Sequence, residues 1–396
     1  MPKKTVEDIE VRGKRVLLRV DFNVPLSINT GAISDDSRIR ASLPTIKYLV
    51  DHKAKIIVCS HLGRPEGKVI ESLRIAPAAQ RLSQLIGLPV STAPDCIGPE
   101  VESKVSKLKE GDILVLENLR FHPEEEANDP DFARKLATVA DVYVDDTFST
   151  AHRVHASIVG VAKYLPAVAG FLMNKELKVM EKLLHDPERP WACIIGGGKV
   201  SDKIELLQNM LKKVDMLLVG GGMAAIFLKA QGYEVGHVLL EDDKLDLARK
   251  LLQEAEEGKV PFLLPVDAVV AGEIKAGAST RVVPTTNIPA DSHIVDIGPK
   301  SIVLFHSELR KCRTIMWNGP LGIYEIPQFA QGTRSIASFL STLDATTIIG
   351  GGSSAEVVEE MGLTDKMTHV STGGGASLKF LEGVTLPGVK VLLDKK

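Results

Sequence analysis

Arginine and histidine recur just after short apolar stretches in the first half of the chain. The stretches 15–20, 55–60, 112–117 and 141–144 have the length and composition of buried strands. The residues that follow them include Asp21, Asn23, His61, Arg64, Arg120, His122, His152, Arg153 and His155. A guanidinium offers a planar pair of donors to carboxylate or phosphate, so several arginines at one sheet edge would suit a small polyanion. A single arginine is more commonly a solvated surface group, and the recurrence at successive strand ends is what favours a binding site.

Two further arginines belong to the same prediction. Arg38 and Arg40 stand in the polar segment 34–40, which we expect to form a loop leading into a helix that begins near Ala41. They would add two guanidinium groups to the polyanion site.

The second half of the chain carries glycine after its strands. Triplets at 196–198, 220–222, 350–352 and 373–375 each follow a predicted strand. Glycine permits positive φ and close backbone approach, and a helix N-terminus behind it presents free N–H groups to phosphate. One such turn is explained equally well by tight strand-to-helix packing, but four favour a cradle for nucleotide phosphates.

Two lysines follow the first triplet. Lys199 and Lys203 are four residues apart, so on a helix that opens there they would share a face and could both reach phosphate oxygens. The alternative is an ordinary solvated helix face.

Other nucleotide motifs fit less well. Gly196–Lys199 is not a Walker A loop, because Cys193 and Val200 stand where that motif needs glycine and serine or threonine. Residues 220–225 do match the loose G-x-G-x-x-A dinucleotide pattern, with Glu241 and Asp242 about 20 residues further on. A NAD-dependent dehydrogenase is therefore an alternative, although residues 350–355 match the same pattern and the arginines would stay unexplained. A nucleotide-binding protein without turnover is a third possibility.

The elements that must position these groups alternate along the chain. Further apolar runs at 191–195, 216–219, 262–265, 314–317, 346–349 and 366–370 are predicted strands, and amphipathic stretches separate them. This alternation is typical of an α/β protein whose parallel sheets carry helices on both faces. Ligands of such sheets bind beyond the carboxyl ends of the strands, which is where the polar and glycine-rich segments stand.

The length of 396 residues fits two domains. We expect a first lobe over 1–172, a connecting hinge helix within 173–188 and a second lobe over 189–380. The connector is placed by the helical spacing of 174–184 and by Pro187 after it. The tail, 381–396, is expected to return to the first lobe.

Composition narrows the class of function. A formal charge of -3 argues against a general nucleic-acid or anionic-membrane surface. The N-terminus is charged, and no apolar run reaches the roughly 18 residues of a membrane span. The cysteines Cys59, Cys96, Cys193 and Cys312 lie far apart and favour buried thiols in a reducing cytoplasm.

Several longer motifs, read together and in order, resemble the phosphoglycerate kinase family. They are Arg19-Val-Asp-Phe-Asn-Val-Pro, Ser60-His-Leu-Gly-Arg-Pro, Gly197-Gly-Lys-Val-Ser-Asp-Lys-Ile, Trp317-Asn-Gly-Pro-Leu-Gly and Ser371-Thr-Gly-Gly-Gly-Ala-Ser-Leu. The resemblance implies two Rossmann-like three-layer αβα lobes, joined by a helix, with a ligand cleft between them. It also implies reversible phosphoryl transfer between 1,3-bisphosphoglycerate with ADP and 3-phosphoglycerate with ATP, with Mg²⁺ carried by the nucleotide. A monomer without nucleic-acid or membrane partners is expected.

The resemblance also assigns residues. For 3-phosphoglycerate it implies Asp21, Asn23, Arg38, His61, Arg64, Arg120 and Arg153. For the nucleotide it implies Gly197, Lys203, Gly222, Gly298, Asn318, Glu325, Gly351, Gly352, Ser353 and Ser354. Because the acceptor carboxylate is ionised at neutral pH, no general base is needed, and catalysis must be positioning and charge stabilisation. We expect Arg38, Lys199 and the backbone N–H groups of Gly373 and Gly374 to stabilise the transferring group.

The chain departs from the family pattern beside these loops. Ser353 stands where the family has an aspartate for the nucleotide's magnesium, so the metal ligand is open between a serine hydroxyl or water, Glu356, and weaker metal binding. Residues 145–149 replace Asn-Asp-Ala-Phe-Gly, Gly198 replaces a common alanine, and the loop 27–32 is slightly long.

Overall fold

The computed structural model describes residues 2–27, 31–238 and 241–395, so residues 28–30 of the long loop at 27–32 lie outside the described residues. The chain forms two compact units: Met1–Lys178 together with Thr385–Lys396, and Val179–Val384. The division falls inside helix α6 (Phe171–His185), which begins three residues before the expected 174–184, and the second unit extends past residue 380. Within the described ranges, no helix is long and apolar enough to cross a membrane.

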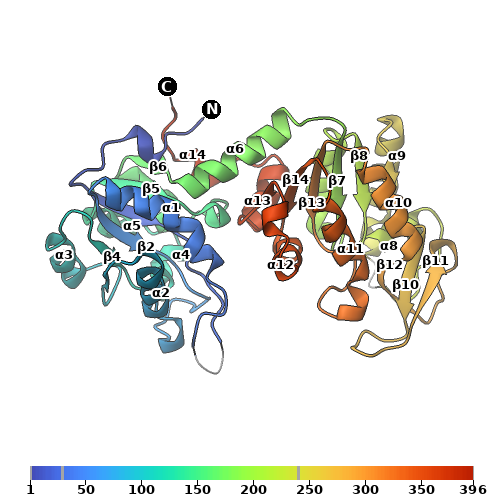
Figure 1. Ribbon diagram of the computed structural model, residues 1–396, viewed down its shortest axis with the longest axis horizontal. Coiled ribbons are helices and arrows are strands. Elements are labelled where there is room, and N and C mark those ends of the chain that lie inside the picture. The colour runs from blue at the N-terminus through green and yellow to red at the C-terminus, as the bar shows by residue number, and fades with distance from the viewer. Residues whose placement is uncertain (1, 28–30, 239–240, 396) are drawn as a thin grey trace. The chain divides into compact units, whose positions relative to one another are not determined.

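The first unit is built on a parallel sheet with the strand order β3-β4-β2-β1-β5-β6, flanked by helices (Figure 1). Its strands are β1 (Arg15–Arg19), β2 (Lys55–Cys59), β3 (Val90–Thr92), β4 (Ile113–Val115), β5 (Val142–Asp145) and β6 (Ala167–Ala169). Its helices are α1 (Ser37–Asp51), α2 (Ala76–Ile86), α3 (Pro99–Ser106), α4 (Pro123–Glu126), α5 (Pro130–Thr138), the first part of α6, and α14 (Pro387–Lys390). Central strands such as β1 and β2 are buried beyond their first residue, as expected when both faces are covered.

Three features of this unit were not predicted. β3 is a short edge strand whose Ser91 and Thr92 are exposed, so it leaves no apolar run in the sequence. β6, at the other edge, has three residues. Helix α1 begins at Ser37 rather than near Ala41, so Arg38 and Arg40 belong to its first turn and not to a loop.

The C-terminal segment packs on the first unit. Leu393 donates its N–H to the carbonyl of Ala167 at 2.9 Å, and Gly388 donates to that of Ala151 at 2.8 Å. The two ends of the chain lie side by side (Figure 1), where Lys3 pairs with Asp394.

The second unit repeats the architecture with a parallel sheet in the order β15-β14-β13-β7-β8-β9. Its strands are β7 (Trp191–Ile195), β8 (Met216–Val219), β9 (Phe262–Leu263), β13 (Thr314–Asn318), β14 (Thr346–Gly350) and β15 (His369–Val370). Its helices are α7 (Ile204–Leu211), α8 (Ala224–Ala230), α9 (Leu245–Glu257), α10 (Pro299–Leu309), α11 (Gln331–Leu340), α12 (Gly352–Glu360) and α13 (Gly375–Leu381).

Two predictions for this unit were wrong. The expected strand 366–370 shortens to β15 because 364–366 forms a 3-10 turn. A separate antiparallel sheet of β10 (Asp267–Ala271), β11 (Thr280–Pro284) and β12 (His293–Ile297) was missed. β11 is mostly exposed, and the polar residues His293 and Asp296 interrupt β12, so neither shows a clear apolar run.

Candidate functional site: two sheet edges

The strand ends of the first unit bring the predicted polar residues to one edge. β1, β2, β4 and β5 are parallel neighbours, so the segments that follow them all leave at the carboxyl edge of the sheet. The chain turns from one side of β1 to the other there, which is the position where open α/β sheets bind ligands.

Asp21 is the first anchor of this edge. Its carboxylate lies 2.6 Å from Arg38 Nη1 and accepts a hydrogen bond of 2.5 Å from the Ser149 hydroxyl. Burial alone would raise the pKa of Asp21, but the charge of Arg38 and this hydroxyl outweigh burial and hold the pKa below its usual range. Asp21 is therefore ionised at neutral pH and restrains Arg38, whose side chain is 41% exposed and reachable by a ligand.

His61 lies among several guanidinium groups. Its Nδ1 is 3.1 Å from Nη2 of the buried Arg19. Burial lowers the pKa of His61 well below its usual value, and the charges of Arg19, Arg120 and Arg153 lower it further. The imidazole is therefore neutral at pH 7 in a field that favours anions.

A short chain of hydrogen bonds links three of the loops. Asn23 Oδ1 accepts the N–H of Gly63 at 2.8 Å, and Arg120 Nη1 donates to the Gly63 carbonyl at 2.8 Å. Gly63 has φ +65°, a backbone conformation that favours glycine at this junction. Asn23, Gly63 and Arg120 are thus fixed relative to one another.

The remaining predicted residues differ in their placement. Arg64 is exposed and makes no described side-chain contact, so it is not drawn into the cluster. His155 is buried 3.8 Å from Glu125, and burial with the charge of Arg153 lowers its pKa to about 4. Arg40 points to Asp36 at 2.7 Å instead of joining the edge.

Arg19 was not singled out from the strand pattern. It ends β1, is 1% exposed, and also donates to Ser157 Oγ at 3.0 Å and to the carbonyl of Val20. The available signal was a charged residue at the end of an otherwise buried strand.

The glycine loops of the second unit interlock at the corresponding edge. Gly196 donates its N–H to the Asn318 carbonyl at 2.9 Å, and Met223 donates to the Gly197 carbonyl at 3.0 Å. A Cβ on Gly196 would lie 2.1 Å from the Pro320 carbonyl oxygen, and one on Gly221 would lie 2.7 Å from that of Gly197. Glycine is needed here for backbone-to-backbone packing as well as for any ligand.

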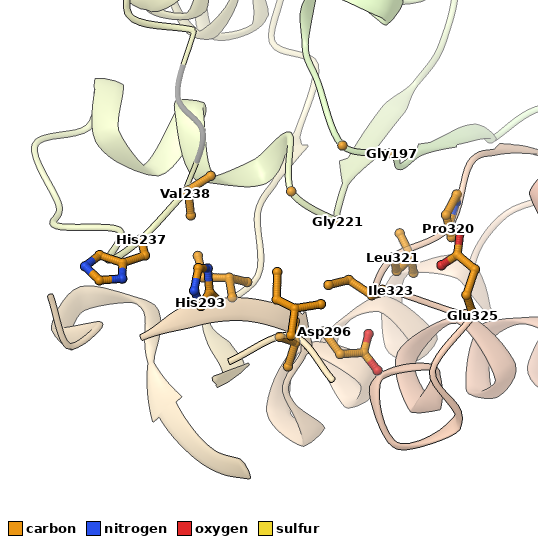
Figure 2. Close-up of a pocket in the computed structure, with 16 residues that line it drawn as sticks. Gly197, Gly221, His237, Val238, His293, Asp296, Pro320, Leu321, Ile323 and Glu325 are labelled. Carbon is orange, nitrogen blue, oxygen red and sulfur yellow. The ribbon is translucent and has the colours of Figure 1, made fainter. Parts of the chain in front are cut away.

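These loops form one wall of a cavity of about 410 Å³ (Figure 2). Gly197, Gly221 and Gly222 line it together with Leu321 and Glu325. Figure 2 shows Pro320 and Glu325 toward one end and His237 and His293 toward the other. The two imidazole rings lie 5.4 Å apart, and sequence reasoning had indicated neither of them.

Asn318 and Lys203 form a polar pair at the end of β13. Lys203 Nζ donates to Asn318 Oδ1, and burial lowers the pKa of Lys203. Asn318 Nδ2 is buried without a hydrogen-bond partner among the described residues. A Cβ atom placed on Gly351 would lie 3.2 Å from Asn318 Nδ2, so this donor is directed toward the Gly351 loop.

Lys199 is not on a helix, contrary to prediction. The 3-10 turn η7 (Ser201–Lys203) and then α7 begin after it, and Lys199 is exposed. Lys199 comes before the first helical turn because residues 196–198 are held in the interlocked loops.

Two glycine assignments also look different in the structure. Gly298 directly precedes α10 and packs against Asp267, where a Cβ atom placed on it would lie 2.3 Å from the Asp267 carboxyl carbon. Gly298 does not line the cavity. Gly373 donates its N–H to Ser371 Oγ at 3.1 Å, so this donor is already engaged. Gly374 has φ +50° and precedes α13.

The N-terminal part of α12 offers oxygen ligands for a cation carried by a nucleotide. The Tyr324 hydroxyl donates to Glu356 Oε2 at 2.7 Å and is also hydrogen-bonded to Ser353. Ser354 is buried and accepts the N–H of Gly319 at 2.7 Å, so it serves the loop rather than a metal. Mg²⁺ bound to phosphates needs only one or two protein oxygens, and Ser353 with Glu356 fits that requirement.

Glu241, one of the two acidic residues of the dinucleotide alternative, has another role. Glu241 Oε2 accepts the N–H of Ser201 at 2.9 Å, which holds the turn before α7. It is therefore occupied by backbone and not presented as a ribose ligand.

Comparisons with known proteins agree over nearly the whole chain. The family model described as phosphoglycerate kinase matches residues 6–384. A phosphoglycerate kinase of Dictyoglomus turgidum is 57% identical with 100% of both chains covered, and one of Pelotomaculum thermopropionicum is 56% identical with the same coverage. The solved structure of phosphoglycerate kinase from Coxiella burnetii has a TM-score of 0.88 and 39% identity, with 98% of each chain covered. That from Pyrococcus horikoshii has a TM-score of 0.86 and 32% identity, covering 99% of this chain and 98% of the other.

Proposed function

The chain belongs to the phosphoglycerate kinase family and transfers a phosphoryl group between ATP and the carboxyl group of 3-phosphoglycerate, and we propose that its two sheet edges divide this work. In this proposal the first unit binds 3-phosphoglycerate and the second binds the nucleotide. The observation that carries it is the contrast between the edges: buried guanidinium groups around His61 in one unit, and a glycine-walled cavity in the other.

The first edge suits a doubly anionic metabolite. Arg19, Arg120 and Arg153 all act electrostatically on His61, and Arg38 is held nearby on Asp21. Phosphate and carboxylate groups would be bound by forked guanidinium donors, with Asn23 and Asp21 left to accept from the substrate hydroxyl.

The second edge suits a nucleoside phosphate. The cavity is large enough for a nucleoside, its walls are mostly apolar, and Glu325 supplies a carboxylate for ribose hydroxyls. Lys203 and the unpaired Asn318 Nδ2 lie beside the loop that leads into α12, where phosphate oxygens would be expected. Ser353 and Glu356 would hold Mg²⁺, which when bound neutralises charge on the phosphate oxygens.

Transfer needs no proton abstraction from the acceptor. The attacking carboxylate is ionised at neutral pH, so the residues supply orientation and positive charge. We assign charge stabilisation to Arg38 and to the exposed Lys199, supported by the Gly374 backbone, since the Gly373 N–H is already bonded to Ser371. Arg38 must leave or share its contact with Asp21 to reach the transferring group.

The two substrates of this proposal are bound by different units, so turnover requires a hinge motion. The chain passes between the units at two places, inside α6 and at Val384–Thr385, and we assign the hinge to these segments. Small-angle X-ray scattering should show compaction only when both ligands are present, and unchanged scattering with both ligands bound would contradict the hinge assignment.

A monomer in the cytoplasm completes the proposal. All four cysteines are free and buried, which suits a reducing compartment. Light scattering after size exclusion at several concentrations tests the monomer, and cell fractionation tests the location.

The direct test is turnover with metal titration. The purified chain is given ATP and 3-phosphoglycerate and coupled to glyceraldehyde-3-phosphate dehydrogenase and NADH while magnesium is varied. We expect turnover within roughly 1–100 s⁻¹, typical of kinases. Bound ATP without turnover at any magnesium or manganese concentration would contradict the assignment of a working catalytic site.

A further inference from the structure

A compact group of possible metal ligands lies in the first unit, among residues that the phosphoryl-transfer proposal does not use. The carboxylate of Asp95, the thiol of Cys96 and the imidazole of His122 place their ligand atoms within 4.8 Å of one another. Among the described residues this is the one cluster of three such groups that meets this distance.

The fold brings two distant segments together at this point. Asp95 and Cys96 follow the edge strand β3, and His122 stands between the segment after β4 and helix α4. His122 Nε2 lies 2.7 Å from Asp95 Oδ1, which also accepts the N–H of Cys96 at 2.6 Å. The thiol of Cys96 is hydrogen-bonded to the same carboxylate.

The neighbouring structure restrains these side chains. The His122 ring packs on Phe132, with centroids 5.2 Å apart, and Cys96 is fully buried. The segment after β3 is tied to the segment after β4, because Glu117 donates its N–H to the Asp95 carbonyl at 3.3 Å. The ligand atoms are therefore held close before any ion binds.

One side of the cluster is open to solvent. The side chain of Asp95 is 46% exposed and that of His122 is 26% exposed. An ion could enter from this side, and a water molecule could complete its coordination.

The donor set selects the class of cation. A thiolate, an imidazole and one carboxylate suit a borderline transition metal, whereas Mg²⁺ and Ca²⁺ prefer oxygen ligands alone. Zinc binds such ligands at about 2.0–2.3 Å in a tetrahedron, so its ligand atoms lie roughly 3.3–3.8 Å apart. The Asp95–His122 pair, now 2.7 Å apart, would open to this spacing, and no other pair of ligand atoms in the cluster is more than 4.8 Å apart.

We propose that Asp95, Cys96 and His122 form a binding site for a transition-metal dication of the zinc class, with water as the fourth ligand. The ion takes the place of the thiol proton of Cys96, which passes to the solvent, and of any proton on His122 Nε2, so that the neutral ring carries its proton on Nδ1. It clamps the segment after β3 to the segment before α4, two residues beyond Arg120. This site is separate from the magnesium that accompanies the nucleotide.

Cobalt substitution gives the first test. The untagged full-length chain, treated with chelator and exchanged into metal-free buffer, is titrated with Co²⁺ and read by absorbance. We expect a sulfur-to-cobalt charge-transfer band that saturates at one equivalent. Cys59→Ser, which removes a buried thiol on neighbouring β2, should keep the band, and Cys96→Ser should lose it. Absence of the band in the wild type, or its persistence in Cys96→Ser, overturns the proposal.

A thermal measurement covers the case in which a cysteine variant folds poorly. At a Zn²⁺ concentration about 100 times Kd, the unfolding transition of the first unit should rise by roughly 5–10 °C. His122→Gln keeps a donor toward Asp95 but supplies no zinc ligand, so its transition should not move with Zn²⁺. An equal rise in His122→Gln would refute the site.

Discussion

Arg19 donates from Nη2 to Nδ1 of His61 at 3.1 Å, and both side chains are buried at the carboxyl edge of the first sheet. A guanidinium is a donor only, so Nδ1 must accept and the neutral ring must carry its proton on Nε2. Arg19 therefore fixes the tautomer in which His61 can donate a hydrogen bond to a bound anion.

Replacing Arg19 tests this relationship. Arg19→Lys loses the fork that reaches Ser157, the Val20 carbonyl and His61 together, so buried acceptors lose their partner. We expect the free energy of unfolding to fall by about 1–3 kcal/mol, together with a higher KM for 3-phosphoglycerate and a mixed His61 tautomer by NMR. Arg15→Lys on the same strand is the matched control: its pair with Asp141 is at the surface, and its loss should cost about 0–1 kcal/mol. Equal effects of the two variants would argue against a positioning role.

Arg38 is expected to act on the rate. Arg38→Met should lower kcat by roughly 10²–10³, the loss typical of one donor to a charged transition state. Arg40→Met removes a guanidinium two residues away that is paired with Asp36 and 54% exposed, and should leave kcat unchanged. Steady-state kinetics with both substrates saturating measures the difference, and comparable losses in both variants would contradict the assignment of Arg38.

Glu356 is expected to set the magnesium requirement. Glu356→Gln removes the carboxylate at the start of α12 and should raise the half-saturating Mg²⁺ concentration roughly tenfold, equivalent to about 1.4 kcal/mol. Ser353→Asp, which introduces the family's aspartate, should lower that concentration. Glu360→Gln, on the same helix but paired with Arg334 at 3.2 Å, serves as the control. An unchanged magnesium dependence in Glu356→Gln would contradict the role of Glu356 and would favour Ser353 or water as the ligand.

Asp145 makes stability depend on pH. It stands where the family has asparagine, is fully buried, and its Oδ2 has no hydrogen-bond partner among the described residues. Burial raises its pKa from 3.8 to about 7. The folded state therefore holds a proton that the unfolded state releases above about pH 4, and stability falls as pH rises from there through pH 7.

Asp145→Asn should remove this dependence. The amide keeps the acceptor for the Thr147 N–H, 3.0 Å away, and carries no charge. Its stability advantage over the wild type should grow from pH 5 to pH 8, with an upper limit on the order of 4 kcal/mol. Urea unfolding at several pH values measures it. Asp141→Asn is the control, and its effect on stability should have the opposite sign, because Arg15 lowers the pKa of the exposed Asp141 carboxylate. Parallel stability curves for wild type and Asp145→Asn would contradict the interpretation.

Two neighbouring glycines should respond differently to alanine. A Cβ on Gly198 meets nothing within 4 Å and its φ is ordinary, so Gly198→Ala should stabilise the chain by about 0.4–1 kcal/mol through the unfolded state. Gly196→Ala places a Cβ 2.1 Å from the Pro320 carbonyl oxygen and should destabilise the second unit by several times that amount. Urea unfolding measures the change in stability of both variants. Similar changes would mean that the interlocked loops can move to accommodate a Cβ atom at residue 196.

Local sequence patterns determined the central strands and the type of each sheet edge. The apolar runs at 15–20, 55–60 and 191–195 correspond to β1, β2 and β7 within one residue, because strands covered on both faces must be apolar throughout. The glycine triplets and most of the recurring arginines also lie after parallel strands in the structure, since the segments that follow such strands all leave at the carboxyl edge of the sheet. Edge elements such as β3 and β11 escaped because exposure removes the apolar pattern.

Only the tertiary structure decided which side chains meet. No spacing in the sequence joins Arg19 to His61, Lys203 to Asn318, or Asp95 to His122, because parallel crossovers bring residues 27 to 115 positions apart to one place. The sequence also could not distinguish Arg38, which is restrained by Asp21, from Arg40, which is paired with Asp36. Residue type fixes the chemistry a side chain can do, whereas its partners depend on where the chain crosses the sheet, and burial then sets its charge.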